Sequence, residues 1–212
     1  MSTQASRPLE ETTRGRTELT RNTLLEAGIL LFSEQGYEAT STRQIEARAG
    51  VQRNLMTYHF GSKDEFWKAC MTRLTGQMGD RLGPAVLQSN DIELRERIRF
   101  LIKQFVRTSA SMPEFARIMF DEGRSNGWRL EWLVANNKTR FFERLKTLFD
   151  DGRKADFIPD MPFVNFYYTL VGSAAIFSMS AECELLTGKT PLNDKIVDAH
   201  AETIANLLTK KT

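Results

Sequence analysis

Residues 37–66 read YEATSTRQIEARAGVQRNLMTYHFGSKDEF. Residues 41–44 match the S-x-x-Q capping box, which predicts a helix start, and Gly50 predicts its end. A second short helix is expected over about residues 52–59, and the S-x-x-E box at 62–65 opens the next one. Two short helices around a glycine turn can place one helix in a DNA groove. The start of the helix that follows can hold a phosphate beside it.

The residues before this stretch predict a helix over about 18–35 that supports the pair. Leucines 24, 25 and 31 recur with Phe32 at helical spacing, and Gly36 ends the pattern. The inward positions of the two short helices are apolar and have the spacing to pack on that face: Ile45, Ala49, Val51, Met56 and Phe60.

The opposite face of the second short helix carries side chains that can read base edges: Gln52, Arg53, Asn54, Thr57 and Tyr58. Arginine suits guanine, asparagine and glutamine suit adenine, and a threonine methyl or an aromatic ring suits the thymine methyl. Lys63 stands at the start of the next helix, where unpaired N–H groups and the helix dipole favour an anion. His59 lies one turn earlier and can donate to the same phosphate.

The composition of the 212 residues is that of an ordinary globular protein, with 41% hydrophobic and 26% charged residues. A net charge of +2 permits nucleic-acid binding without indicating it. With two histidines, and with cysteines only at 70 and 183, the sequence offers few candidate ligands for a metal ion, and the cysteines are expected to be buried free thiols. No nucleophile–base pair, paired carboxylates or phosphate-cradling glycine loop is present, so we expect no enzyme and no cofactor. No secretion signal is recognisable, so a cytoplasmic, nucleoid-associated location is expected.

An all-α fold is predicted, since no stretch has the period of a strand. Residues 1–16 are polar and are expected to be an unstructured tail, although Arg14 and Arg16 could form an arm into the minor groove. The helix-turn-helix domain is expected over 17–80, because Gly76, Gly79, Gly83 and Pro84 mark a junction, and a helical domain over 81–212. The helices expected in that domain cover about 92–109, 113–122, 128–151, 162–186 and 191–209.

Residues 161–181 contain no charged residue, which approaches the length of a membrane span. The stretch has several serines, and an aspartate and a glutamate flank it where a basic cluster would be expected. A buried helix is therefore predicted, with no membrane partner.

Aromatic residues are dense from residue 92 onward, and they offer more apolar surface than a bundle of this length requires. We therefore expect a pocket for a small apolar or aromatic effector. Its candidate lining residues are Phe105, Arg117, Phe120, Trp128, Trp132, Asn136, Phe166, Tyr168, Ser173 and Phe177. The alternative is that the aromatics form a solid core and that the protein is a ligand-independent DNA-binding or partner-binding module.

Small residues at 172–175 would let another helix approach closely. They predict that the last two helices pair with their copies in a homodimer, which would present two recognition helices about 34–36 Å apart. An intramolecular contact of Ala174 and its neighbours is the alternative.

Residues 23–51 and the following Tyr58-His-Phe-Gly-Ser-Lys resemble, in register, the N-terminal domain of the TetR family of bacterial transcriptional regulators. The resemblance covers about residues 20–70. It implies a homodimeric, ligand-responsive regulator, usually a repressor, that binds a near-palindromic double-stranded operator.

By position, the resemblance implies DNA contacts from Thr42, Arg43, Gln52, Arg53, Asn54, Thr57, Tyr58, His59 and Lys63. This sequence departs from the family pattern at Gly28, where alanine is usual, at Thr57, where tyrosine is frequent, and at Leu55, where small or polar residues are common. The glycine is expected to lower helix stability by about 1 kcal/mol.

Overall fold

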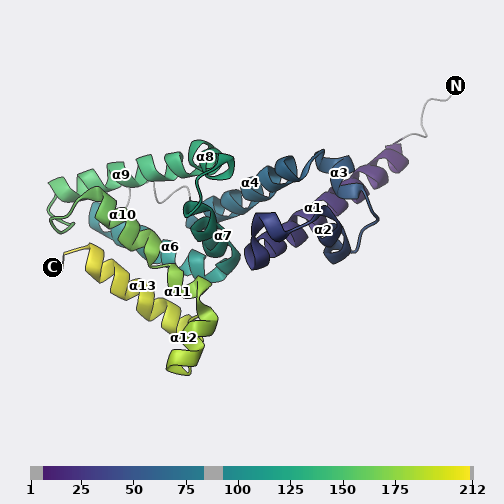
Figure 1. Cartoon of the computed structure of the whole chain (residues 1–212). Coiled ribbons are helices and arrows are strands. Elements are labelled where there is room, and N and C mark those ends of the chain that lie inside the picture. Colours follow the sequence, from purple (N-terminus) through teal and green to yellow (C-terminus); the bar gives the residue numbers. More distant parts are fainter. Residues whose placement is uncertain (1–6, 84–92, 211–212) are drawn as a thin grey trace. The chain divides into compact units, whose positions relative to one another are not determined.

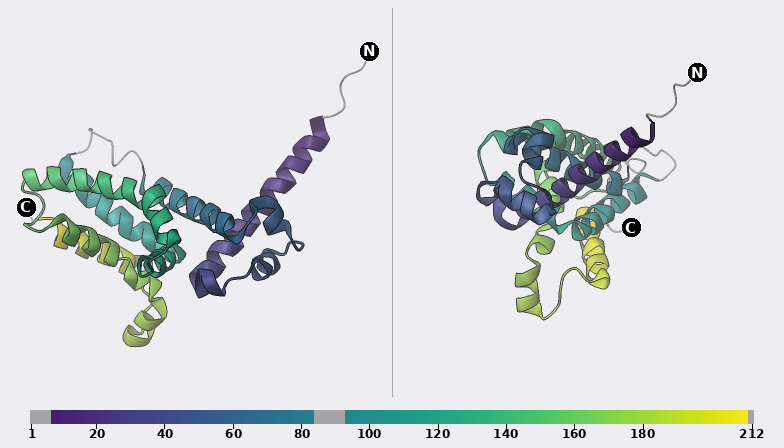
Figure 2. Two further views of the ribbon diagram at one scale, coloured as in Figure 1. Left: turned by 45° about the horizontal axis from the view of Figure 1, so that its top comes forward. Right: turned by 90° about the vertical axis from the view of Figure 1, so that its right-hand side faces the viewer.

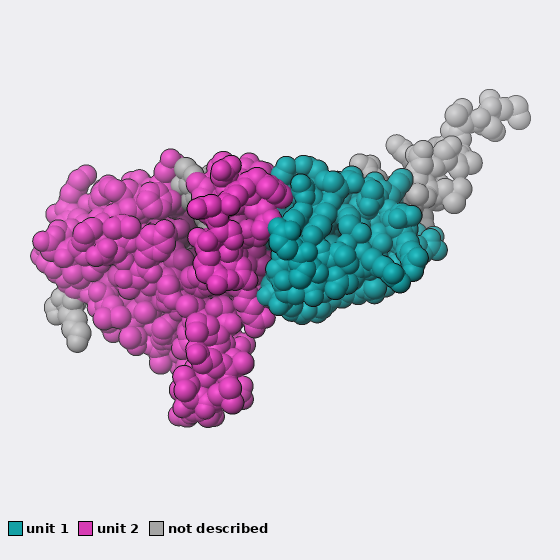
Figure 3. Space-filling model, in the orientation of Figure 1, with its two compact units in different colours: residues 1–74 teal, residues 75–212 magenta. Residues whose placement is uncertain are grey.

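The computed structural model describes residues 7–83 and 93–210, with side chains described at 15–83, 93–137 and 141–210. Regular structure in these ranges is helical, so the predicted all-α class is confirmed. The chain divides into two compact units, residues 1–74 and 75–212, which are coloured separately in Figure 3.

The part of the first unit that the structure describes contains three helices and the beginning of a fourth, shown in purple to blue in Figure 1. They are α1 (Arg7–Ala39), α2 (Thr42–Ala49), α3 (Leu55–Phe60) and α4 (Lys63–Leu82).

Helix α1 begins at Arg7, so residues 7–16 are helical where the sequence predicts an unstructured tail. Their sequence has no periodic apolar pattern, but a helix nucleated further along extends at low cost, and Pro8 lies in the first turn, where proline is tolerated. The predicted break at Gly36 is present, since this residue has φ 77° and ψ 173° inside α1. Residues 1–6 lie outside the described residues.

The predicted capping box of α2 is complete. The Ser41 N–H donates to Gln44 Oε1 at 2.8 Å, and the Gln44 N–H donates to Ser41 Oγ at 3.2 Å. Gly50 ends the helix in the left-handed conformation, with φ 65°. At the start of α4, the Glu65 N–H donates to Ser62 Oγ at 3.1 Å.

The core of the first unit forms where α1, α2, α3 and α4 supply large side chains that are at most 2% exposed: Leu24, Phe32, Ile45, Met56, Phe66, Trp67, Cys70 and Met71. The Phe66 ring lies so close to α1 that a Cβ on Gly28 would be 2.4 Å from Phe66 Cε1. The glycine at this position therefore permits a close approach of two helices.

Helix α4 continues past Gly76 and Gly79 and ends at Leu82, so its end lies within the glycine cluster of residues 76–83 that the sequence marks as a junction. Leu74, Met78 and Leu82 are at most 5% exposed and repeat every four residues. Their burial outweighs the helix-propensity penalty of about 1 kcal/mol for each glycine.

The second unit contains α6 (Leu94–Ser111), α7 (Pro113–Gly123), α8 (Trp128–Leu133), the π-helical segment η1 (Val134–Lys138), α9 (Thr139–Lys154), α10 (Phe163–Gly172), α11 (Ala175–Ser178), α12 (Ser180–Thr187) and α13 (Asp194–Leu208). Its core lies among α6, α9, α10 and α13, which Figure 2 shows from two further directions.

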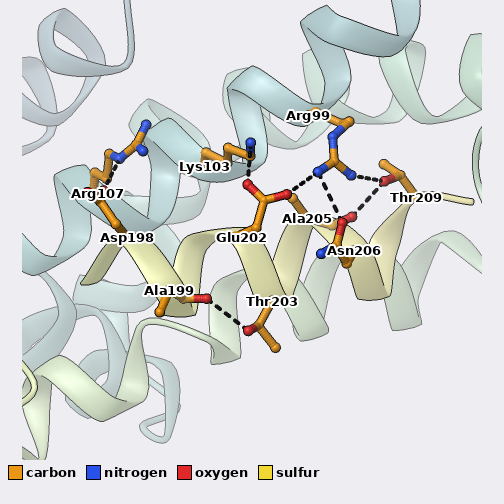
Figure 4. A network of polar contacts seen from close by, with 10 residues as sticks. All are labelled: Arg99, Lys103, Arg107, Asp198, Ala199, Glu202, Thr203, Ala205, Asn206 and Thr209. Atoms are coloured by element: carbon orange, nitrogen blue, oxygen red, sulfur yellow. Dashed lines mark hydrogen bonds and ion pairs between the residues drawn. The ribbon is translucent and has the colours of Figure 1, made fainter. Parts of the chain in front are cut away.

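Helix α13 packs along α6, and a row of basic residues on α6 binds acidic and polar residues on α13 (Figure 4). Arg107 Nε lies 2.8 Å from Asp198 Oδ1, and Lys103 and Arg99 both pair with Glu202. The three basic residues are spaced four positions apart along α6, so a single face of this helix makes all these contacts.

Two helices that the sequence predicts as continuous are interrupted. The first is broken by η1, where Asn136 Nδ2 donates to the Trp132 carbonyl at 2.8 Å. The second is divided into α10, α11 and α12, because Ser173 Oγ donates back to the Leu170 carbonyl at 2.6 Å, and His200 Nε2 lies 2.9 Å from the Ser173 carbonyl. Side-chain hydrogen bonds of this kind compete with the helix ladder, and hydrophobic periodicity does not reveal them.

The charge-free stretch is only partly buried, contrary to the prediction of a buried helix. Phe166, Leu170, Ala174 and Phe177 are at most 4% exposed, whereas Tyr168 is 66% exposed. Within the described residues, no single helix is long and apolar enough to cross a membrane. One pair, Phe163–Ser178 with Ser180–Thr187, meets the length and composition criteria together but is bent by 73°.

Candidate nucleic-acid interface

Helices α2 and α3 are joined by a turn in which two residues have positive φ. Gly50 has φ 65° and Asn54 has φ 68°, a conformation that asparagine tolerates better than most residues. Helix α3 begins only at Leu55, so Gln52, Arg53 and Asn54 precede the helix where the sequence predicts them within it. Asn54 forms the N-cap, without a capping bond from its own side chain.

The predicted base-reading side chains lie on the surface. Tyr58 is 80% exposed, and Gln52, Arg53, Asn54 and Thr57 are also exposed. Met56, in contrast, is fully buried, so α3 has one inward and one outward face. The outward face therefore offers a guanidinium, two amides, a methyl group and an aromatic ring, the groups that bind base edges.

His59 lies at the end of α3 and is held from α1. Arg21 Nη1 donates to the His59 carbonyl at 2.7 Å, and the Arg21 guanidinium carbon lies 4.3 Å from the centroid of the Phe60 ring. Desolvation, and then the nearby Arg21 charge, lower the pKa of His59 below its usual 6.5. His59 is therefore mainly neutral at pH 7. One nitrogen of the neutral ring carries a hydrogen and can still donate to a phosphate.

Lys63, the predicted phosphate-binding residue, is the first residue of α4. Its Nζ lies 4.0 Å from the centroid of the Tyr37 ring, and the Tyr37 hydroxyl donates to the Asp64 carboxylate. Tyr37 also meets Trp67 edge-on, with the ring centroids 6.4 Å apart. A partly exposed ammonium group is thus placed beside the N-terminus of α4 by an aromatic ring fixed to the same unit.

Thr42 and Arg43 occupy the first turn of α2. Arg43 is exposed and Thr42 is half-buried, so both can reach a phosphate that runs past this helix start. On the other end of α2, Arg48 donates to Glu34 through both Nη atoms, which ties α2 to α1.

Sequence reasoning missed three residues that hold this surface in place: Arg21, Tyr37 and Glu46. Glu46 is 6% exposed, and its Oε1 accepts the Met56 N–H at 3.0 Å. For Glu46, the available signal in the sequence was its position next to Ile45, which the helical pattern places inward.

The predicted effector residues lie at several places in the second unit. Phe105 stacks on Phe141 with centroids 5.9 Å apart, Phe166 packs on Phe149 at 5.2 Å, and Phe177 meets His200 at 5.8 Å. These three phenylalanines are at most 5% exposed.

The other predicted effector residues are more accessible. Trp128 is 38% exposed, Asn136 is exposed, and Arg117, Phe120 and Trp132 are half-buried. Tyr168, at 66% exposed, does not line the interior of a single chain, whereas Ser173 is buried and donates to the Leu170 carbonyl.

A buried ion pair lies among these residues. Glu122 on α7 is 6% exposed, and both its carboxylate oxygens accept from Arg129 Nε, at 2.9 and 3.0 Å. The Arg129 guanidinium also lies 5.9 Å from the Trp128 ring centroid. In the described residues, no group of three or more His, Cys, Asp or Glu side chains could hold a metal ion.

The sequence matches known proteins mainly over this first unit. A family model described as "Bacterial regulatory proteins, tetR family" matches residues 24–70. Over 67 residues the chain is 36% identical to the HTH-type transcriptional dual regulator CecR of Shigella flexneri, which covers 32% of this chain and 30% of that protein. Over 110 residues it is 27% identical to the HTH-type transcriptional repressor NicS of Pseudomonas putida, covering 51% of this chain and 50% of that protein. The matches thus span half or less of these curated relatives.

The similarity of the fold extends further. The crystal structure of a TetR family transcription regulator from Marinobacter aquaeolei superposes with a TM-score of 0.68 over 93% of this chain and 100% of that chain. The sequence identity is 19%, so this likeness concerns the fold.

Proposed function

Because this chain belongs to the TetR family of bacterial regulatory proteins through the helix-turn-helix of residues 24–70, we propose that it controls transcription as a homodimer bound to a near-palindromic operator. The observation that carries the proposal is the outward face of α3 and the turn before it, where Arg53, Thr57 and Tyr58 are exposed above a buried Met56. Lys63 and His59 flank this face and would bind the phosphates.

DNA binding is tested by fluorescence anisotropy on the DNA that flanks the gene of this protein, with the variants Arg53→Ala and Lys63→Ala. Arg53→Ala should weaken operator binding by about 1–3 kcal/mol and relax the preference at one base position. Lys63→Ala should weaken binding to all DNA sequences. It should also make the dependence of log affinity on log salt concentration (the salt slope) less steep, by the amount that about one phosphate contact contributes.

The control is Arg124→Ala, which removes the same charge from an arginine that is 78% exposed in the second unit. It should leave both properties unchanged. If the two test variants behaved like this control, the proposed binding face would be wrong.

The homodimer is proposed from the apolar side chains that α10 and α13 leave exposed. Val164, Tyr168 and Leu207 are 54%, 66% and 59% exposed. Exposed apolar surface of this kind is typical of an interaction site, and α10 packs on α13 in the single chain. A symmetric pair of such faces would hold two recognition helices one DNA turn apart.

Sedimentation equilibrium tests the dimer. Leu207→Glu should shift the protein toward the monomer and weaken operator binding, because it buries a charge at the proposed contact. Leu19→Glu changes a leucine that is 67% exposed on α1 and should leave the dimer intact. A monomeric wild-type protein at micromolar concentration would contradict the proposal.

We further propose that the protein is a repressor released by a small apolar or aromatic effector, through a shift of population between two spacings of the recognition helices. A ligand can do this only if it binds one state more tightly, by several kcal/mol for a complete switch. A panel of small aromatic molecules should contain one that lowers operator affinity and raises Tm.

A second candidate is a ligand-independent DNA-binding module with a solid core. The packing of Phe105, Phe166 and Phe177 against other rings favours it. It predicts that no molecule of the panel changes operator affinity.

A further inference from the structure

Helix α3 is too short to be stable by itself. It has six residues, and isolated helices of fewer than about 12 residues are marginal in water. Its N-cap, Asn54, has φ 68° and makes no capping bond, so the first N–H groups of α3 depend on acceptors from elsewhere in the unit.

The acceptor comes from α2. Glu46 is 6% exposed, and its Oε1 accepts the N–H of Met56, the second residue of α3, at 3.0 Å. The carbonyl of the same glutamate accepts the Val51 N–H at 3.1 Å, so Glu46 binds the chain on both sides of the turn. A charged acceptor gives a stronger hydrogen bond than a neutral one, and its negative charge complements the positive end of the helix dipole.

Glu46 is almost entirely buried where it accepts the Met56 N–H. A carboxylate removed from water requires compensation by hydrogen bonds or by a positive charge. Among the described residues, no lysine, arginine or histidine forms an ion pair with Glu46. The N-terminus of α3 therefore supplies the compensation, and the position of each group depends on the other.

The opposite end of α3 is held by a positive charge. Arg21 on α1 donates to the His59 carbonyl at 2.7 Å and covers the Phe60 ring. Helix α3 thus has a negative group at its N-terminus and a positive group at its C-terminus, both provided by other helices. This is the arrangement that stabilises the helix dipole.

We propose that Glu46 is a positioning residue for operator binding, which fixes α3 in its DNA-reading orientation before DNA arrives, with Arg21 as its counterpart at the other end. The inference rests on the proposed function of α3 as the recognition helix. With α3 already ordered, DNA binding does not have to order it, and rigidity of this kind increases affinity. Simple charge repulsion makes the opposite prediction, because removing a carboxylate from a DNA-binding domain should strengthen binding to phosphates.

The test compares Glu46→Ala with Glu46→Gln. Glutamine keeps a side-chain oxygen at the same place, so operator affinity should stay within about threefold of wild type. Alanine removes the acceptor, so operator affinity should fall about 10- to 100-fold, as expected for a lost hydrogen bond to a charged group. Affinity for non-operator DNA and the salt slope should stay the same, since the phosphate contacts are unchanged. Glu18→Ala, which removes an exposed carboxylate from α1, is the control for charge.

Amide hydrogen exchange on the free protein tests the position of α3 independently of DNA. In Glu46→Ala, the amides of residues 56–60 should exchange at least tenfold faster, while those of α2 and α4 keep their protection. Equal operator affinity in Glu46→Ala and wild type, or a gain in both Glu46 variants, would overturn the inference, as would unchanged exchange in α3. If the wild-type protein bound no operator at all, the proposed function would fail, and the exchange experiment would still decide whether Glu46 orders α3.

Discussion

Replacement of Gly28 by alanine should destabilise the first unit, although alanine is the better helix former. Gly28 lies within α1, where Gly→Ala by itself stabilises a helix by about 1 kcal/mol. The new Cβ, however, would lie 2.4 Å from Cε1 and 2.5 Å from Cζ of Phe66, and 3.0 Å from Sγ of Cys70. Ordinary carbon–carbon contacts are about 3.5–4.0 Å, so the ring must retreat by roughly 1 Å.

The Phe66 ring has little room to move. It is fully buried, it meets Phe60 edge-on with centroids 4.9 Å apart, and it lies 6.1 Å from the centroid of Phe32. Overpacking of this kind costs about 1–3 kcal/mol. With the propensity gain of about 1 kcal/mol subtracted, we expect a net loss of up to about 2 kcal/mol, which lowers Tm by up to about 16 °C for a unit of this size.

Thermal and urea unfolding followed by circular dichroism measure this effect. The matched control is Gly76→Ala in the interior of α4, where a Cβ would meet nothing within 4 Å, and which should gain up to about 1 kcal/mol. In Gly28→Ala/Phe66→Leu, the smaller side chain should relieve the clash, so the double variant should be more stable than the sum of the single effects predicts. A stabilised Gly28→Ala protein would refute the reasoning, because it would show that α1 and α4 are not in such close contact.

Three further predictions concern titratable groups. Because the pKa of His59 is lowered in the folded protein, the unfolded chain takes up a proton first as pH falls below about 6.5, so the folded protein should lose stability over this pH range. Operator affinity should rise over the same range, because a phosphate favours the protonated ring. Measurements of stability and of operator affinity against pH, for the wild type and for His59→Gln, check the two opposite changes. Arg129→Met should destabilise the second unit by about 3–5 kcal/mol in urea unfolding, since it leaves Glu122 buried and without its ion pair, whereas a loss below about 1 kcal/mol would argue against a buried pair. Cys70 is buried as the sequence predicts, whereas Cys183 is only half-buried, contrary to that prediction. In the native protein a thiol reagent should therefore label Cys183 and leave Cys70 unmodified, because burial raises the pKa of the Cys70 thiol well above its usual value. Equal labelling, read by mass spectrometry, would contradict this.

The sequence predicted the helix-turn-helix well because its signals are local. The capping box at Ser41 and Gln44 and the turn at Gly50 depend on residues at most four positions apart, and both are present in the structure. Fixed spacing of this kind also predicted which side chains of α3 face outward, since Met56 is buried and Tyr58 is exposed.

Periodicity could not place interruptions caused by contacts distant in the sequence. The division of the predicted helix over 162–186 depends on Ser173 and on His200, 27 residues away. The sequence placed the end of α4 only within residues 76–83, and the continuation of the helix to Leu82 depends likewise on the burial of Leu74 and Met78.

The sequence by itself determined that the chain is helical and that its N-terminal part carries a DNA-reading motif, because capping and helical spacing are properties of neighbouring residues. Only the tertiary structure decided how that motif is held. A carboxylate from α2 and a guanidinium from α1 meet the two ends of α3, and Gly28 admits the ring of Phe66. These contacts join residues 10 to 38 positions apart, and their energies exist only once folding has brought those residues together.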